Sequence, residues 1–388
     1  MEPDDYRKRI LDELWKVRIF DVHSHYCSPG DPVEGLDEYI CGWSQPETSP
    51  VGLSERELDR WRRSRFEAKR SLWFCRSFRV AMQDLYGTRD DGEIVERMNE
   101  VRGMGLPSSM EWMRERSNVG YLVVDTNIDL AAEIGWVLST FRLDSGVLSP
   151  YSGTLEEKME GLEADIEDLA ERWAIACFKI PIAYSRSLYM EEVSPEEAGR
   201  IESEDAGSRS AVEQRRLEDY VYRRIIRKAG ELNLPVEIHT GFGWAIGQRP
   251  LRLSEADPEN LLPVLEDPEC RKTRFILFHG GYPFMSKAGY LAGTFSNVYL
   301  DFTCLSAQSS AVLKRGLDEW IDIVPMDRIV CGSDGSYEWL YFASRYNREC
   351  LAAVLAGKCA EGQMDLDLAL EMGGRILRGN ALSVFEMK

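Results

Sequence analysis

Short apolar runs alternate with amphipathic stretches along most of the chain. The runs that end near residues 20, 125 and 180 are only a few residues long and rich in Val, Ile, Leu and Phe, which is typical of buried parallel strands. The stretches between the runs place apolar residues at helical spacing, as in the segment 154–173. This alternation predicts consecutive βαβ units with a parallel sheet.

The hydrophobic pattern gives eight strand candidates. They are the segments 17–25, 121–125, 136–138 or 141–143, 174–180, 234–239, 275–279, 298–302 and 328–334. The predicted helices are 5–17, 154–173, 217–232, 258–265, 288–295, 312–323, 366–377 and 380–385. We therefore predict an α/β fold, a (β/α)8 TIM barrel formed by residues 1–388 as a single domain. A doubly wound open sheet is the alternative.

A long region without a strand pattern follows the first strand. It spans about residues 27–118 and contains charged segments with aromatic residues, and Ser54 with Glu57 forms a capping-box pattern that starts a helix. We expect a helical insertion that helps to build the substrate pocket, because long connections at the carboxyl end of barrel strands usually do so. A separate small helical domain is the alternative.

The chain has four histidines, and each lies where an apolar run ends. His23 and His25 are two residues apart on a strand, so their side chains point to the same side, as two ligands of one metal ion must. The Asp21 side chain points to the same side, two residues before His23 and deeper in the strand. His239 and His279 end later runs, and Asp334 ends the last one. In a closed barrel these strand ends meet, whereas an open sheet would separate its first and last strands. The pattern therefore predicts one metal centre.

Composition and charge restrict the partners. A net charge of −19 argues against nucleic acid and anionic membranes, and no apolar run is long enough to span a bilayer. The acidic N-terminus lacks a secretory signal, so we expect a cytoplasmic protein, which we also expect to form a homo-oligomer. The nine cysteines are interpreted as buried thiols, with Cys27 and Cys331 as the alternative candidates for a catalytic nucleophile because each lies near a predicted ligand.

The chain resembles the amidohydrolase superfamily, and within it the amidohydrolase 2 group of metal-dependent TIM-barrel hydrolases. The resemblance rests on the motifs Asp-Val-His-Ser-His at 21–25, Glu-Ile-His-Thr-Gly at 237–241, Phe-His-Gly-Gly-Tyr-Pro at 278–283 and Gly-Ser-Asp at 332–334. A further block, at 178–186, is similar to a subgroup that includes the amidohydrolase-like half of some fungal proteins fused to glutamine synthetase.

This resemblance implies roles for individual residues. His23, His25 and Asp334 would ligate a metal, and Asp334 would also accept the proton of the attacking water. His239 would be a further ligand, and His279 either a ligand of a second metal or a general acid and base. The implied metal ligands are therefore His23, His25, Lys179, His239, His279 and Asp334. Lys179 matches the position of a carbamylated lysine in some members, but its neighbours differ from the two-metal pattern, so carbamylation and the metal count stay open. A salt-bridged lysine is the alternative.

Four residues are candidates for substrate binding. Tyr184 and Arg186 follow the fourth strand, and an arginine can clamp a carboxylate through two parallel hydrogen bonds. Trp244, in the glycine-rich loop after His239, could form the wall of an apolar pocket, and Tyr282 lies in the motif around His279. The alternative to a role in substrate binding is that these residues only pack within loops or lie exposed on the surface.

We therefore expect a metal-dependent hydrolase that cleaves an amide or related C–N bond of a small molecule. Imidazole and carboxylate ligands suit one or two Zn, Fe or Mn ions, and such an ion lowers the pKa of bound water from about 15.7 towards ~7. Three alternatives stay open: a metal-dependent decarboxylase, an oxygenase with a non-haem dinuclear iron or iron-manganese centre, and a non-catalytic partner subunit.

Overall fold

Eight strands form one sheet in the computed structural model, which describes residues 2–25, 32–44, 47–125, 128–144, 146–172, 175–204, 207–243 and 250–387. The strands are β1 (Ile19–Ser24), β2 (Val119–Val124), β3 (Val137–Arg142), β4 (Cys177–Ile180), β5 (Val236–Ile238), β6 (Phe275–Leu277), β7 (Val298–Asp301) and β8 (Ile329–Val330). They follow one another in chain order, and each consecutive pair is parallel.

Backbone hydrogen bonds also join the first strand to the segment that follows the last one. The Val22 N–H donates to the Cys331 carbonyl oxygen at 3.0 Å, and the Asp334 N–H donates to the His23 carbonyl oxygen at 2.9 Å. Gly332 leaves room on both sides, because a Cβ atom there would lie 3.2 Å from the His23 backbone nitrogen and 2.1 Å from Thr303 Oγ1, after β7. These contacts complete the TIM barrel that the sequence predicts and bring the ends of β1 and β8 together.

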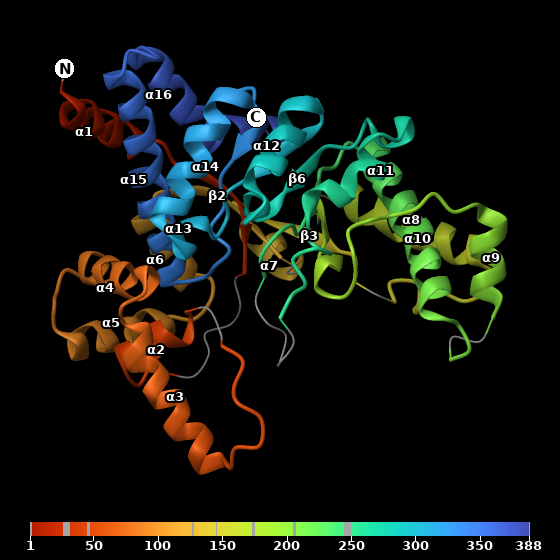
Figure 1. Cartoon of the computed structure of the whole chain (residues 1–388), viewed down its shortest axis with the longest axis horizontal. Coiled ribbons are helices and arrows are strands. Elements are labelled where there is room, and N and C mark those ends of the chain that lie inside the picture. The colour runs from red at the N-terminus through yellow and green to blue at the C-terminus, as the bar shows by residue number, and fades with distance from the viewer. Residues whose placement is uncertain are drawn as a thin grey trace.

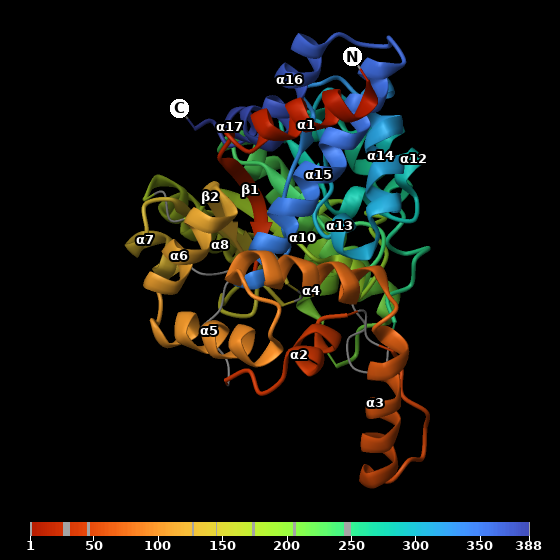
Figure 2. The same ribbon diagram turned by 90° about the vertical axis from the view of Figure 1, so that its left-hand side faces the viewer.

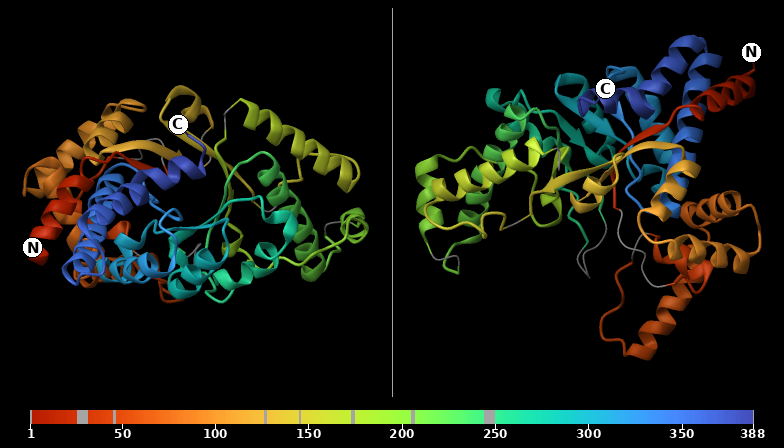
Figure 3. Two further views of the ribbon diagram at one scale, coloured as in Figure 1. Left: turned by 90° about the horizontal axis from the view of Figure 1, so that it is seen from above. Right: turned by 180° about the vertical axis from the view of Figure 1, so that it is seen from behind.

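Helices surround the barrel, as the view from above shows (Figure 3). Those outside the first connection are α1 (Pro3–Leu14), α7 (Ile128–Glu133), α8 (Leu155–Glu171), α9 (Pro195–Ser203), α10 (Ala211–Glu231), α11 (Leu262–Leu265), α12 (Met285–Thr294), α13 (Leu305–Gln308), α14 (Ser310–Ile323), α15 (Glu338–Ala360), α16 (Leu366–Gly374) and α17 (Asn380–Val384). Phe385, directly after α17, packs on Phe20 near the start of β1, with 5.1 Å between the ring centroids. Apolar side chains therefore fill the end of the barrel that is remote from the carboxyl ends of the strands.

The connection between β1 and β2 contains α2 (Leu36–Gly42), α3 (Glu55–Lys69), α4 (Trp73–Tyr86), α5 (Asp91–Gly103) and α6 (Ser108–Ser117). Ser54 and Glu57 form the expected capping box at the start of α3. Helices α2 to α5 gather on one side of the barrel, and α3 projects away from it (Figures 1 and 2). Among the described residues, none of the helices combines the length and the apolar character needed to cross a bilayer.

Several elements differ in extent from the prediction. β3 covers both segments proposed for it. β6 and β8 end before His279 and Asp334, which lie in the following turns with φ angles of 60° and 63°. The polar segment 191–214, which lies between the predicted strand 174–180 and the predicted helix 217–232, contains α9. The longest helix, α15, was not predicted.

Candidate metal centre

A cavity of about 370 Å³ opens at the carboxyl ends of the strands. It is lined by His23, His25, Trp43, Asp125, Arg142, Lys179, Pro181, Tyr184, His239, His279, Asp334, Gly335 and Ser336. All six residues predicted as metal ligands are in this set. The structure thus brings together side chains that lie more than 300 positions apart in the sequence.

His23, His25 and Asp334 form the tightest group in the cavity. The Nε2 atoms of the two histidines are 3.2 Å apart, and Asp334 Oδ1 lies 3.4 Å from His23 Nε2 and 3.3 Å from His25 Nε2. Three donor atoms this close to one another, on side chains from β1 and from the turn after β8, can face a single cation. The left-handed backbone at Asp334 places its carboxylate there, a conformation that few non-glycine residues adopt.

His239 and His279 form a second pair. His239 Nε2 lies 2.9 Å from the Phe242 carbonyl oxygen, and His279 Nδ1 lies 3.1 Å from the Thr303 carbonyl oxygen. A carbonyl oxygen can only accept, so both of these ring nitrogens carry the proton. The other two, His239 Nδ1 and His279 Nε2, are 3.2 Å apart and are left with lone pairs that face each other. Such a pair is suited to a cation or a shared proton.

Lys179 lies beneath these histidines and is almost completely buried. Its Nζ atom is 3.5 Å from His23 Nε2 and 3.5 Å from the centroid of the Phe278 ring. Glu237 occupies the matching register position on β5 and is also buried. Burial lowers the pKa of Lys179 and raises the pKa of Glu237, although the charge of each works in the opposite direction on the other. Burial therefore opposes the charged form of each residue.

The electrostatics favour neutral imidazoles around one anionic carboxylate. Burial lowers the pKa values of His23, His239 and His279, and nearby positive groups such as Lys179 add to the effect. Burial alone would raise the pKa of Asp334, but the hydrogen bond with His25 and the surrounding cationic groups hold it well below its usual range. Neutral nitrogen donors with an aspartate oxygen are the ligands that Zn, Fe and Mn take in proteins. The donor set therefore fits a divalent transition metal.

Three charged residues of this site were not assigned a role from the sequence. Asp125 follows β2, and one of its oxygens lies within 4.8 Å of ligand atoms of His23 and His25. Arg142, at the end of β3, pairs with Asp125 and lines the cavity, while Glu237 lies below it. Asp125 and Arg142 lie at the end of a predicted strand, so the positional rule that identified the histidines would also have identified them. Glu237 lies within its strand, where that rule does not apply.

The residues predicted to bind substrate are dispersed. Tyr184 lines the cavity with its ring 4.5 Å from that of His239. Arg186 is not part of the lining, because its guanidinium is held by Asp219 and by the carbonyl oxygen of Tyr189. Tyr282 packs against Phe242 behind the site. Trp244 lies outside the described residues.

The cysteines of the described part of the chain are free and buried. Burial raises the pKa of the Cys331 thiol, which opposes a role as a thiolate nucleophile. Cys27 lies outside the described residues.

Comparisons with known proteins agree with this geometry. An amidohydrolase family model matches residues 205–387, the part of the chain that carries His239, His279 and Asp334. Protein fluG of Emericella nidulans is 27% identical over 262 residues, which cover 63% of this chain and 29% of that protein. The chain therefore spans less than a third of the length of this relative.

Two solved structures share the barrel over almost the whole chain. A candidate metal-dependent hydrolase from Lactobacillus casei has a TM-score of 0.77 at 18% identity, covering 97% of each chain. Uronate isomerase from Thermotoga maritima has a TM-score of 0.70 at 16% identity, covering 98% of this chain and 97% of the isomerase. At these identities the likeness concerns the fold. The family match, with the histidine and aspartate motifs that it contains, shows that residues 205–387 are similar to amidohydrolases, and the whole chain has the TIM-barrel fold of these structures.

Proposed function

We propose that this protein is a metal-dependent hydrolase that cleaves an amide or related C–N bond of a small molecule with activated water. The observation that carries the proposal is the convergence of His23 Nε2, His25 Nε2 and Asp334 Oδ1 within 3.4 Å of one another. The match of residues 205–387 to an amidohydrolase family model supports it. The cytoplasmic location and the homo-oligomer expected from the sequence stay predictions.

His23, His25 and Asp334 would hold the first cation, and His239 and His279 are the further donors. When bound, a divalent ion supplies a water ligand of lowered pKa and polarises a substrate oxygen. The chain's own residues would then accept and donate protons. Asp334 is anionic and would accept one proton from that water. The same proton would then pass to the leaving nitrogen, either directly or through His279 Nε2, whose lone pair can take it up and release it.

The cavity wall offers a positive group and an aromatic one for substrate recognition. Arg142 has its guanidinium beside Asp125 and is partly exposed, and Trp43 has 45% of its surface exposed. A carbonyl compound with a planar apolar part and a negatively charged or strongly polar group would contact both. Lys179 lies deeper than either residue, where it could influence the metal more directly than the substrate.

Isomerisation of a sugar acid is a second candidate. The uronate isomerase of Thermotoga maritima shares the barrel over nearly the whole chain, and Arg142 lies where it could bind a sugar-acid carboxylate beside the metal ligands. Against it, the aromatic wall formed by Trp43 suits an apolar substrate better than a hydrated sugar.

In the experiment, protein loaded with Zn, Mn or Fe is incubated with each member of a panel of cyclic amides, N-acyl amino acids and hexuronates. The reactions are run in water labelled with heavy oxygen and followed by mass spectrometry and NMR. Hydrolysis places a solvent oxygen in the product and frees an amine, whereas isomerisation leaves the substrate mass unchanged. Release of carbon dioxide would indicate the decarboxylase alternative, and consumption of dioxygen by the iron-loaded protein would indicate the oxygenase. His25→Ala is the inactive control, and absence of hydrolysis across the panel would contradict the proposal.

A further inference from the structure

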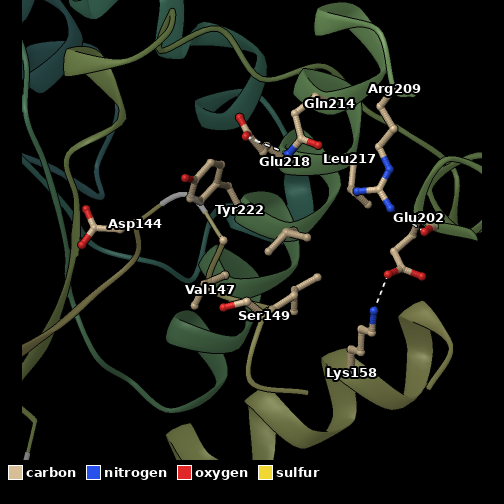
Figure 4. Close-up of a pocket in the computed structure, with 13 residues that line it drawn as sticks. Asp144, Val147, Ser149, Lys158, Glu202, Arg209, Gln214, Leu217, Glu218 and Tyr222 are labelled. Carbon is tan, nitrogen blue, oxygen red and sulfur yellow. Dashed lines mark hydrogen bonds and ion pairs between the residues drawn. The ribbon is translucent and has the colours of Figure 1, made fainter. Parts of the chain in front are cut away.

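The cavity in Figure 4 lies outside the metal centre, between the segment after β3 and the helices α8, α9 and α10. It has a volume of about 400 Å³, but its charged side chains have partners, as Lys158 has in Glu202. Buried polar atoms without a hydrogen-bond partner lie elsewhere in the described part of the chain, and several belong to the barrel strands. Two residues with such atoms, His23 on β1 and Glu237 on β5, face each other beneath the metal cavity.

The two ring nitrogens of His23 have different surroundings. Its Nε2 atom faces the metal cavity, 3.2 Å from His25 Nε2 and 3.4 Å from Asp334 Oδ1. Its Nδ1 atom lies 3.5 Å from Glu237 Oε2. This contact is too long for a hydrogen bond as it stands, and the described residues offer the buried Nδ1 atom no other partner. A small movement of either side chain would form the bond.

Glu237 also lacks hydrogen bonds. It is completely buried, and neither of its oxygens has a hydrogen-bond partner of ordinary geometry among the described residues, although the thiol of Cys177, a weak donor, faces it. A carboxyl group buried without hydrogen bonds is costly, so this one needs a donor. In either protonation state it keeps an oxygen that can accept, and the N–H at His23 Nδ1 is a donor within reach.

A metal ligand needs a lone pair at the atom that faces the cation. His23 Nε2 is that atom, so the single proton of the neutral ring belongs on Nδ1. Metal-bound histidines usually donate their second N–H to a carboxylate or a carbonyl oxygen, which fixes the orientation of the ring. His239 and His279 have such partners in the carbonyl oxygens of Phe242 and Thr303. For His23, the group in the equivalent position is Glu237.

Charge balance with Lys179 is the competing role for Glu237. The two residues are register partners on β4 and β5, and the charge of each acts on the other. The two roles differ in what the side chain at position 237 must supply. Charge balance needs a negative charge, whereas orientation of His23 needs only an oxygen that accepts a hydrogen bond.

We propose that Glu237 is a positioning residue of the metal centre, which accepts a hydrogen bond from His23 Nδ1 and so keeps the Nε2 lone pair directed at the cation. The group acts through His23 and does not line the cavity itself. The inference rests on the metal centre of the proposed function, but not on the reaction that is proposed there.

The tautomer of His23 and the affinity for Zn test the proposal without a substrate. NMR of protein labelled with heavy nitrogen identifies the protonated ring nitrogen, and competition with a chelator measures the affinity. We expect the proton on Nδ1 in the metal-free wild type. Glu237→Met, which has no acceptor oxygen, should remove this preference and weaken Zn binding about 10–100-fold. Glu237→Gln keeps an acceptor oxygen without the charge, so it should keep the tautomer and lose less than about tenfold in affinity.

Cys177→Ala is the control for packing, because it removes another buried side chain beside Glu237 and leaves the acceptor in place. It should leave the tautomer unchanged. If Glu237→Met does not fold, the wild-type tautomer and Glu237→Gln decide the matter. The proposal is overturned if the wild-type proton lies on Nε2, if Glu237→Met changes neither quantity, or if Cys177→Ala shifts the tautomer as Glu237→Met does. It is also overturned if Glu237→Gln is as damaging as Glu237→Met, which would assign charge balance instead.

Failure of this inference is distinct from failure of the proposed function. A wild type that hydrolyses amides but carries the His23 proton on Nε2 would overturn the role of Glu237 alone. A wild type with the proton on Nδ1 and the expected response to Glu237→Met, but without hydrolysis of any amide, would overturn only the proposed reaction.

Discussion

Glu338, the first residue of α15, accepts hydrogen bonds from both terminal nitrogens of Arg102, at 2.7 and 2.8 Å. Arg102 belongs to α5 in the insertion, whereas Glu338 lies four residues after Asp334. The Glu338 carboxylate is completely buried and also accepts from the hydroxyls of Tyr39 and Tyr86. This network joins the insertion to the segment that carries Asp334, the aspartate that we propose as a metal ligand.

Arg102→Met should destabilise the protein by about 3–5 kcal/mol, because it leaves the Glu338 carboxylate buried without its cationic partner. The measurement is the free energy of unfolding from urea titration. Arg62→Met is the matched control in the same insertion, since Arg62 and its partner Asp59 are both more than half exposed. The control should change the free energy of unfolding by less than about 0.5 kcal/mol. Equal effects of the two substitutions would show that the buried pair does not anchor the insertion.

The two histidines that face each other should have fixed and opposite tautomers. We expect the proton of His239 on Nε2 and that of His279 on Nδ1, because each donates to a main-chain carbonyl oxygen. NMR spectra of protein labelled with heavy nitrogen report the protonated nitrogen of each ring directly. On addition of Zn, the resonances of His239 Nδ1 and His279 Nε2 should move most. A proton on either of these two nitrogens in the metal-free protein would contradict the assignment.

Asp267 should make stability depend on acid pH. Burial raises its pKa, but hydrogen bonds and charge from Arg227 and Arg223 outweigh burial and lower it below the usual value. A carboxyl whose pKa is lower in the folded protein adds stability above its unfolded pKa, about 3.9, and loses it as the pH falls through the folded value. Asp267→Asn should therefore cost about 1–3 kcal/mol near neutral pH.

The cost of Asp267→Asn should shrink below about pH 4, where the wild-type carboxyl begins to take up a proton in the unfolded chain. Unfolding curves between neutral pH and pH 3 measure this difference. Asp327→Asn alters an exposed aspartate and should show no such trend. A cost that stays constant over the whole range would contradict the lowered pKa of Asp267.

The strand ends could be predicted because each histidine and aspartate among the predicted ligands ends or closely follows a short apolar run. The helix α15 could not, because most of its residues are buried, including polar ones such as Asn347 and Arg348, so it has no alternating apolar and polar faces. Arg186 illustrates a different limit of prediction from the sequence. Its position after β4 is visible in the sequence, but Asp219 comes from α10, and only the packing of that helix decides which carboxylate the arginine meets.

The site depends on backbone geometry that the sequence does not reveal. His279 and Asp334 both have left-handed φ angles in the turns after β6 and β8, and these turns direct their side chains into the cavity. A hydrophobic pattern predicts where a strand lies, but not the conformation of the turn that follows it. The residues that line the cavity together were therefore predictable as a set of candidate ligands, while their arrangement in two groups was not.

Metal analysis of the purified protein tests the central claim most directly. The protein is incubated with Zn, Mn or Fe, dialysed and analysed by plasma mass spectrometry, beside His25→Ala, Asp334→Ala and the control Asp327→Asn. The control removes an exposed carboxylate that does not line the cavity. We predict at least about one equivalent of metal in the wild type and the control, and a large loss in both ligand variants. A wild-type protein that retains no more metal than Asp334→Ala would contradict the account.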